Sequence, residues 1–323
     1  AFNQDISSWD VSNGIDFSSM FEGNLAFNQD ISNWDVSNGS NFSYMFENTG
    51  AFNQDISVWN VSEGEDFNSM FSDADAMLAA GWASTPTASD FVGKTITGTE
   101  EADTLTGEDG NDVINGSSAD DVLIGGKGHD NYFVDSKDDR VIEKFLHVGI
   151  DTIYASVTYT ASSYVENLTL TGSSNINGSG NSLDNKITGN SGDNKLYGKD
   201  GDDEIYGGAG KDKIYGWKGE DIIYGEDGDD YLKGHYSKDK LYGGAGADIL
   251  YGGTSADELY GGEGNDKLYG ESSADKLYGG AGEDTLSGGT SKDELHGGDG
   301  DDKLYGGSSS DTLYGDDGDD YLK

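Results

Sequence analysis

The fold is decided by a nine-residue unit, represented by Gly261-Gly262-Glu263-Gly264-Asn265-Asp266-Lys267-Leu268-Tyr269. From Gly198 to Lys323 the chain divides into 14 consecutive units of this length, each with aspartate at its sixth position and isoleucine or leucine at its eighth. Four more units stand earlier, starting at Gly98, Gly107, Gly116 and Gly125. A fixed period of this kind indicates a repeat architecture in which each unit packs on its neighbours.

The unit has the composition of a metal-binding turn. Glycines at positions one, two and four allow backbone angles that a side chain would forbid, so main-chain carbonyls can turn toward the point at which the sixth-position carboxylate aims. These oxygens suit the six to eight oxygen ligands of Ca²⁺ at roughly 2.3–2.6 Å and suit zinc or copper poorly. The last three residues, such as Lys267-Leu268-Tyr269, predict a brief strand with its middle side chain inside. Successive turns alternate sides, which predicts an 18-residue coil with an ion between turns one coil apart.

The candidate metal ligands are the sixth-position carboxylates and the glycines of the most regular turns. The carboxylates belong to Asp103, Asp112, Asp121, Asp130, Asp203, Asp212, Asp221, Asp230, Asp239, Asp248, Asp257, Asp266, Asp275, Asp284, Asp293, Asp302, Asp311 and Asp320. The glycines are Gly243, Gly244, Gly246, Gly261, Gly262, Gly264, Gly279, Gly280, Gly282, Gly297, Gly298 and Gly300. Same-side pairs of turns predict about 14 Ca²⁺ ions, which would add roughly +28 to the net charge of −43. Without them, self-repulsion and glycine entropy favour the unfolded chain.

From about Gly98 to its end, the sequence resembles the RTX, or hemolysin-type, calcium-binding nonapeptide repeats, which carry this same unit. The resemblance implies a right-handed parallel β-roll, type I secretion in the unfolded state, and folding when the chain meets extracellular calcium. We therefore expect a mainly all-β protein whose first RTX block is residues 98–134 and whose main β-roll is residues 198–323.

Residues 1–75 have a different period, of 25 residues, with copies starting at Ala1, Ala26 and Ala51. Each copy begins Ala-Phe-Asn-Gln-Asp-Ile-Ser and ends in a Met-Phe pair, and stacked copies would bury aromatic rows that one copy could not bury alone. This repeated motif resembles the BspA-like leucine-rich repeats of bacterial surface proteins. The resemblance implies a short solenoid cap with a role in attachment. The rows of Asn3, Gln4 and Asp5 are read as ladders that satisfy the backbone, with a recognition strip as the alternative.

Two segments interrupt the repeats. Residues 76–97 predict a capping helix and linker, with Met77-Leu78-Ala79-Ala80 followed by Gly81, Trp82 and Pro86. Residues 135–197 predict an irregular continuation of the β-solenoid through longer coils. Nonapeptide spacing returns there with Asn185 and Asn194 at the sixth positions, and because an amide is a weaker, neutral ligand we expect these coils to be uncalcified.

The fourth position distinguishes the two edges of the main β-roll. It is glycine in the units starting at Gly225, Gly243 and onward at every second unit, and serine in the units between, at Ser237, Ser255, Ser273, Ser291 and Ser309. One interpretation is that the glycine edge carries a regular row of calcium ions while the serine edge binds calcium more weakly. The alternative is that serine fits the same turn and both edges bind calcium equally, because the aspartates remain in place on both.

Position nine points outward, and on one sheet it is aromatic in every coil: Tyr206, Tyr224, Tyr242, Tyr260, Tyr278, His296 and Tyr314. Coils about 4.8 Å apart would stack these rings into a ladder. The ladder either stabilises neighbouring strands or forms an exposed row that docks a sugar, another solenoid or a filament neighbour.

Composition excludes several functions. The 62 acidic residues against 19 basic ones argue against a nucleic-acid partner, and no apolar run reaches the length of a membrane span. No cysteine is present, and the four histidines fall at different repeat positions, so no catalytic site is expected and the chain is predicted not to be an enzyme. The chain begins at Ala1 and stops at Lys323 inside a repeat, so we expect a piece of a longer polypeptide.

These observations together predict a secreted bacterial protein of the cell surface or extracellular matrix. It would bind calcium and act in adhesion or fibre assembly, with self-association or a cell-surface or glycan ligand as its partner. The alternative is a non-catalytic, calcium-dependent secretion and folding module of an extracellular enzyme.

Overall fold

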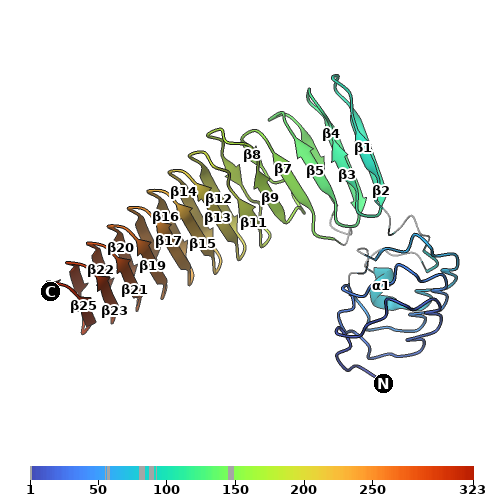
Figure 1. Cartoon of the computed structure of the whole chain (residues 1–323), viewed down its shortest axis with the longest axis horizontal. Coiled ribbons are helices and arrows are strands. Elements are labelled where there is room, and N and C mark those ends of the chain that lie inside the picture. The colour runs from blue at the N-terminus through green and yellow to red at the C-terminus, as the bar shows by residue number, and fades with distance from the viewer. Residues whose placement is uncertain are drawn as a thin grey trace. The chain divides into compact units, whose positions relative to one another are not determined.

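The computed structural model describes residues 2–54, 56, 59–79, 84–86, 91, 93–144 and 149–323, and the chain divides into two compact units, Ala1–Thr152 and Ile153–Lys323. The described residues contain one short helix, α1 (Asp75–Ala79), at the start of the segment expected to hold one (Figure 1). Ala80, Gly81 and Trp82 of that segment lie outside the described residues. None of the helical structure described is long and apolar enough to cross a membrane.

The described residues between 2 and 74 form three stacked coils made of turns, joined by isolated parallel bridges from Asp16 to Asn41 and from Asn41 to Asp66. The predicted aromatic rows are confirmed: Phe17 stacks on Phe42 with ring centroids 5.4 Å apart, and Phe42 stacks on Phe67 at 5.3 Å. Phe27, Phe46 and Phe52 are fully buried. The core of these coils is therefore made between copies of the repeat, as the 25-residue period predicts.

The tryptophans of the three copies differ in burial although they occupy the same repeat position. Trp9 is 52% exposed, whereas Trp34 and Trp59 are 3% and 2% exposed. The indole N–H groups of Trp34 and Trp59 donate to the carbonyl oxygens of Ile6 and Ile31 in the preceding coil, at 3.1 and 3.0 Å. The second and third indoles thus tie each coil to the one before it.

The polar ladder is confirmed for the asparagine and glutamine rows, whereas Asp5 and Asp30 accept the N–H groups of Ser7 and Ser32 within their own turns. The side-chain oxygen of Asn3 accepts the backbone N–H of Asn28, and that of Asn28 accepts the N–H of Asn53, both at 2.9 Å. The amides of Gln29 and Gln54 donate to the same two oxygens at 2.9 and 2.8 Å. The asparagines stabilise the stack because they satisfy backbone N–H groups that no sheet ladder reaches, and the glutamines add side-chain hydrogen bonds between coils.

Beyond these coils the chain winds as a parallel β-solenoid whose strands alternate between two sheets. In the first unit one sheet has the order β1 (Thr95–Thr97), β3 (Val113–Asn115), β5 (Asn131–Val134), and the other has the order β2 (Thr104–Asp109), β4 (Val122–Lys127), β6 (Arg140–Ile142). Strand β7 (Thr152–Ala155) begins at the last residue of this unit.

The second unit continues the same alternation over many more strands (Figure 1). One sheet contains β9 (Asn167–Leu170), β11 (Lys186–Thr188), β13 (Glu204–Ala209), β15 (Ile222–Asp227), β17 (Lys240–Ala245), β19 (Glu258–Glu263), β21 (Lys276–Ala281), β23 (Glu294–Asp299) and β25 (Thr312–Asp317). The other contains β8 (Tyr159–Thr160), β10 (Gly178–Ser179), β12 (Lys195–Asp200), β14 (Lys213–Lys218), β16 (Tyr231–Tyr236), β18 (Ile249–Gly253), β20 (Lys267–Ser272), β22 (Thr285–Thr290), β24 (Lys303–Gly307) and β26 (Tyr321–Leu322).

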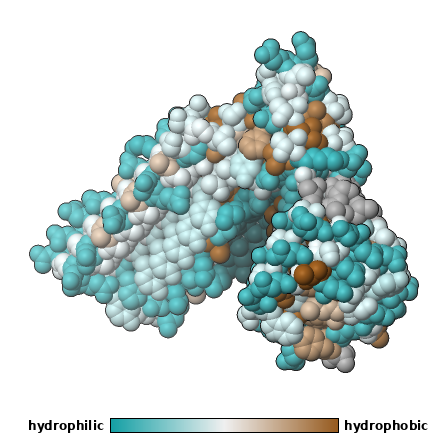
Figure 2. Space-filling view, turned by 45° about the vertical axis from the view of Figure 1, so that its right-hand side comes forward, coloured by the Kyte–Doolittle hydropathy of each residue, from teal (hydrophilic) through white to brown (hydrophobic). Residues whose placement is uncertain are grey.

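The register confirms the 18-residue coil and the all-β solenoid class. Leu241 pairs with Leu259 and Leu259 with Leu277, each one coil further along. The eighth-position side chains from Ile205 to Leu304 have no exposed surface, so a continuous aliphatic column fills the space between the two sheets. Most of the surface visible in Figure 2 is correspondingly hydrophilic. Between the nonapeptide blocks, Leu168 pairs with Ile187 across 19 residues, one residue more than in the regular coils.

The strands are longer than the three residues predicted. Strand β20 covers Lys267–Ser272, so it runs from the seventh position of one unit through the third position of the next. Its burial alternates, with Leu268 and Gly270 inside and Tyr269 outside. The prediction was wrong because glycine at position one was read as the start of a turn, whereas it occupies an inward-facing strand position.

The aromatic ladder forms as predicted. Tyr224, Tyr242, Tyr260 and Tyr278 stack with ring centroids 4.8–4.9 Å apart, and His296 continues the row to Tyr314. These rings are mostly half-buried by their neighbours, so the ladder stabilises adjacent strands.

Substitution of Trp34 by alanine should cost about 3–5 kcal/mol of unfolding free energy, because it empties a buried site and removes the N–H donor to Ile6. The matched control Trp9→Ala alters the same repeat position where the ring is half-exposed, and it should cost less than about 1 kcal/mol. Urea unfolding of the intact chain, followed by circular dichroism, measures both. Equal losses in the two variants would contradict stabilisation by coil stacking.

Candidate metal-binding turns

The sixth-position aspartates lie in two rows, in which each coil uses one carboxylate oxygen of the next. The backbone N–H of Asp248 donates to Oδ1 of Asp266 at 2.8 Å, and the N–H of Asp266 donates to Oδ1 of Asp284 at 2.7 Å. The same step joins Asp212, Asp230, Asp248, Asp266, Asp284, Asp302 and Asp320 on one edge. It joins Asp203, Asp221, Asp239, Asp257, Asp275, Asp293 and Asp311 on the other.

The second carboxylate oxygen, Oδ2, is buried and has no hydrogen-bond donor through most of both rows. In the described part of the chain this applies to Asp121, Asp130, Asp203, Asp212, Asp221, Asp230, Asp239, Asp248, Asp257, Asp266, Asp275, Asp284, Asp293 and Asp302. An ionised carboxylate buried without a partner is strongly destabilising. Each of these oxygens therefore requires a proton or a cation.

The position-one glycines keep the space beside these oxygens open. A β-carbon on Gly261 would lie 2.5 Å from Oδ2 of Asp266 and 2.4 Å from the carbonyl oxygen of Gly279 in the next coil. At Gly243 the corresponding oxygens, of Asp248 and Gly261, would both be 2.4 Å away. A carboxylate oxygen and a main-chain carbonyl oxygen thus border the same small space, and any side chain larger than hydrogen would fill it.

Burial raises the pKa of these carboxyl groups far above the value of an exposed aspartate. The pKa of Asp239 rises to about 9, and the pKa values of Asp203 and Asp275 rise to about 8. Desolvation is the largest cause, and neighbouring carboxylates in the row add to it, while the N–H bond to Oδ1 lowers the pKa. Charge on these groups is therefore costly unless a cation compensates it.

These residues fit calcium. Carboxylate and carbonyl oxygens are the ligands of a hard cation, and a row of them repeated at every coil offers several oxygens from two turns. Magnesium requires a tighter, near-octahedral set and keeps its waters, so it suits this geometry less well. The position-six aspartates named above would hold the ions, which supply the positive charge that the buried oxygens need.

The two asparagine turns differ from the aspartate turns in the way that the sequence predicts. The side-chain amide of Asn194 donates to the carbonyl oxygen of Ile176 at 2.7 Å, and that of Asn185 donates to the carbonyl oxygen of Val165 at 3.1 Å. Their side-chain oxygens accept N–H groups of their own turns, from Asn190 at 2.9 Å and Asn181 at 2.7 Å. The amide N–H groups thus bind the backbone oxygens themselves, which supports the hypothesis that these coils are uncalcified.

Asp103 is placed at the start of a row but does not share its geometry. Its Oδ2 accepts the backbone N–H of Thr99 at 2.6 Å and the Thr99 hydroxyl at 2.9 Å, and these hydrogen bonds lower its pKa. The structure gives Asp103 the hydrogen bonds that the other aspartates lack. It is therefore a weaker candidate ligand than the sequence analysis predicts.

Sequence reasoning missed Asp139, Asp151 and Glu143. The N–H of Asp121 donates to Asp139 and the N–H of Asp130 donates to Asp151, both to Oδ1 at 2.8 Å, so the rows continue past the last regular unit. Asp139 was detectable, because it follows Asp121 by one 18-residue coil. Asp151 was not, because its coil has 21 residues.

Asp130, Glu143 and Asp151 together form a buried acidic cluster. Each brings a carboxylate oxygen within 4.8 Å of the other two, and the hydroxyl of Tyr132 donates to Glu143. Burial raises the pKa of Asp130 to about 7. This set could hold a cation at the end of the first block, with a ligand, Glu143, that the nonapeptide does not supply.

The glycine and serine edges have different turns but the same buried oxygen. On the glycine edge the fourth residue has a φ near +130°, as in Gly264, whose N–H donates to the carbonyl of Ala281 at 2.7 Å. On the serine edge Ser273 has a φ of +84°, and its hydroxyl donates to the carbonyl of Thr254 at 3.3 Å. Because Oδ2 is buried without a hydrogen-bond donor on both edges, the structure favours the alternative in which both edges bind calcium.

The pKa values predict that low pH stabilises the calcium-free solenoid. Carboxyl groups whose pKa is raised in the fold contribute stability that is complete below about pH 4 and is lost as the pH rises through their folded values of about 6 to 9. In chelator, β-structure followed by circular dichroism should increase between pH 8 and pH 4, and calcium added at about pH 5, where the calcium-free solenoid is folded with these carboxyl groups protonated, should release protons. Absence of proton release, measured by calorimetry in two buffers, would contradict charge compensation by the ion.

Asp266→Asn should remove about one or two bound ions and raise the calcium concentration needed for folding, because the new amide would donate to the carbonyls as that of Asn194 does. Equilibrium dialysis with elemental analysis gives the ion count. Asp103→Asn is the matched control and should leave the count unchanged, since Thr99 already satisfies that carboxylate. A count that falls equally in both variants would show that burial of Oδ2 does not select the sites.

Comparison with protein-family models gives two matches. Residues 1–82 match a family described as Mycoplasma protein of unknown function, DUF285. Residues 97–132 and overlapping segments between 179 and 322 match the RTX calcium-binding nonapeptide repeat. No curated protein matches the chain.

RTX repeats bind calcium and are typical of secreted proteins. The match covers more than half of the sequence and coincides with the turns described above, and the chain therefore belongs to the RTX calcium-binding nonapeptide repeat family.

Proposed function

We propose that this chain is part of a secreted bacterial surface or extracellular-matrix protein that folds on binding calcium and acts in adhesion or fibre assembly. The observation that carries the proposal is the pair of rows of buried aspartate oxygens without donors, because these make the fold depend on a cation. Calcium is scarce inside cells and abundant outside, so a solenoid of this kind would remain unfolded until it is exported.

The charge of the chain supports the same conclusion. Its formal net charge is −43, and most of its acidic groups lie in the repeats. About 14 calcium ions, shared between adjacent turns of both edges, would reduce this to roughly −15. The turns from Asp203 to Asp320 account for about twelve of these ions, and the first block accounts for the remainder.

Adhesion or assembly is the use we favour for the folded chain. Both repeat types present the same side chains at regular intervals, which suits binding to an extended or repetitive partner. The similarity of residues 1–75 to BspA-like repeats supports attachment, and the aromatic ladder from Tyr206 to Tyr314 is a candidate surface for self-association.

The decisive experiment is a calcium titration of the intact chain, followed jointly by circular dichroism and light scattering, with magnesium as the control. We expect cooperative formation of β-structure at millimolar calcium and not at millimolar magnesium, followed by growth of the particle. A folded chain that stays monomeric would instead favour a non-catalytic secretion and folding module of an extracellular enzyme. Folding at neutral pH without calcium would overturn the proposal.

A further inference from the structure

Three successive turns on one edge replace the position-two glycine with a large side chain. Position two has a positive φ in the regular turns, for example +113° at Gly262, and only glycine adopts such angles without strain. Lys199, Trp217 and His235 nevertheless occupy it, with φ values of +92°, +82° and +85°. Strained residues persist where the surrounding structure enforces them, and they concentrate at functional sites.

The three side chains form one column on the outer side of the sheet, because Lys199 pairs with Trp217 and Trp217 with His235 in register. The rings of Trp217 and His235 stack with centroids 4.7 Å apart. In the next column, Tyr197 stacks on Tyr215 at 5.1 Å. Two short aromatic stacks therefore lie next to each other on β12, β14 and β16.

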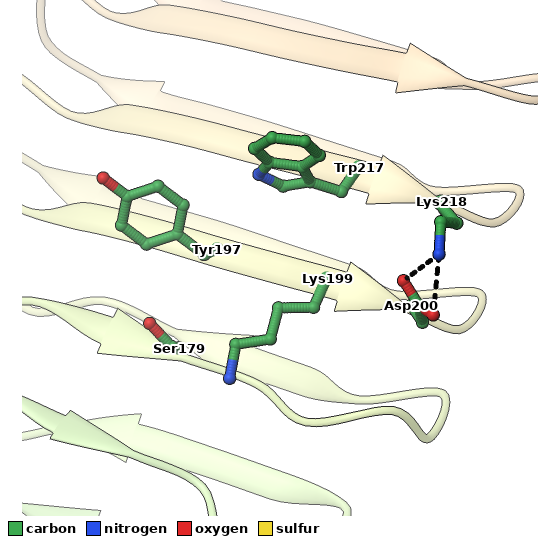
Figure 3. A pocket seen from close by; sticks show the side chains of 6 residues that line it. All are labelled: Ser179, Tyr197, Lys199, Asp200, Trp217 and Lys218. Atoms are coloured by element: carbon green, nitrogen blue, oxygen red, sulfur yellow. Dashed lines mark hydrogen bonds and ion pairs between the residues drawn. The ribbon is translucent and has the colours of Figure 1, made fainter.

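Both stacks end at the same place. Tyr197 is followed in its column by Ser179, and Trp217 is followed by Lys199, so neither ring has an aromatic neighbour on that side. A hollow of about 500 Å³ opens there, lined by Ser179, Tyr197, Lys199, Asp200, Trp217 and Lys218. We call it the ring pocket. Figure 3 shows Tyr197 and Trp217 on neighbouring strands and Lys199 extending toward Ser179.

The charge around the ring pocket is opposite to that of the chain. Lys199 and Lys218 line it, and Lys195 and Lys213 pair in register in the adjacent column of the same face. Lys218 forms an ion pair with Asp200 at 2.9 Å, and the Lys199 ammonium donates to the carbonyl oxygen of Gly180 and interacts electrostatically with Asp203. Among the described residues, Lys195 and Lys213 form no salt bridge. Four lysines around the exposed ring of Trp217 and the half-buried ring of Tyr197, in a chain with 19 basic residues against 62 acidic ones, favour an anionic ligand.

We propose that the ring pocket binds one acidic sugar, a hexuronate unit of an anionic polysaccharide, stacked on Tyr197 and Trp217 with its carboxylate held by Lys199 and Lys218. Aromatic faces suit the apolar C–H face of a pyranose, and the lysines and the Ser179 hydroxyl suit its carboxylate and hydroxyl groups. A nucleic acid is disfavoured, because its dense charge would extend over the acidic coils on both sides of the pocket. The proposal rests on the proposed extracellular function and names the class of ligand.

The test uses the intact chain in saturating calcium, titrated by calorimetry with a short galacturonate oligomer too short to form calcium gels. Trp217→Gly restores the regular turn residue and relieves the backbone, so it should fold at the same or lower calcium while its affinity falls at least about tenfold. The matched control Glu226→Gly makes the same change on the opposite edge, where φ is +75°, and should bind as the original chain does. Lys199→Gly should lower the affinity for the galacturonate oligomer.

Several outcomes would overturn the proposal. The first two are an unchanged affinity of Trp217→Gly and no binding at about 1 mM galacturonate oligomer. The other two are equally strong binding of a neutral galactose oligomer of the same length, and displacement of the galacturonate oligomer by oligothymidylate, a single-stranded nucleic acid. Circular dichroism of the same samples separates this result from the proposed function. Loss of calcium-dependent folding would contradict the proposed function, whereas normal folding without binding would contradict the ring pocket alone.

Discussion

The structure depends on the different roles of the two carboxylate oxygens of each buried sixth-position aspartate. Oδ1 accepts the backbone N–H of the aspartate one coil earlier, which fixes the distance and register between coils. Oδ2 lies beside the carbonyl of the following coil without a donor, as at Asp266 and Gly279. The same side chain therefore builds the stack and needs a proton or a cation at its second oxygen, which is the basis of our proposal that folding and calcium binding are one event.

Glycine at position one is a consequence of the same constraint. The strand continues through this residue with its α-carbon facing inward, and the space where a side chain would lie is bordered by Oδ2 and a carbonyl oxygen. Leucine or isoleucine at position eight fills the interior between the sheets, while positions seven and nine face outward and are free to vary. Variation at these positions, together with variation at positions two and three, allows the solenoid to carry a tyrosine ladder on one sheet and the lysines and rings of the ring pocket on the other.

Some turns depart from this rule, because their side chains satisfy the same oxygens without a cation. Asn185 and Asn194 have a side-chain amide that donates to the backbone in place of a carboxylate oxygen that needs a cation. At Asp103, the backbone N–H of Thr99 donates to Oδ2. These positions lie at the ends of the regular blocks. At these ends the turns therefore have no buried carboxylate oxygen that lacks a hydrogen-bond donor.

The period of the sequence was sufficient to predict the solenoid, the 18-residue coil, the aliphatic interior and the aspartate rows, because repetition forces every unit into the same environment. It was also sufficient to predict the aromatic rows of residues 1–75 and the difference between aspartate and asparagine turns. Strand length, the capping of Asp103 by Thr99 and the participation of Glu143 and Asp151 were decided only by the tertiary structure. These features depend on which atoms the neighbouring coil brings close, and a coil of 21 residues has no periodic signal. The ring pocket likewise requires the register between coils, since Ser179, Lys199 and Trp217 meet only when the chain has wound around twice.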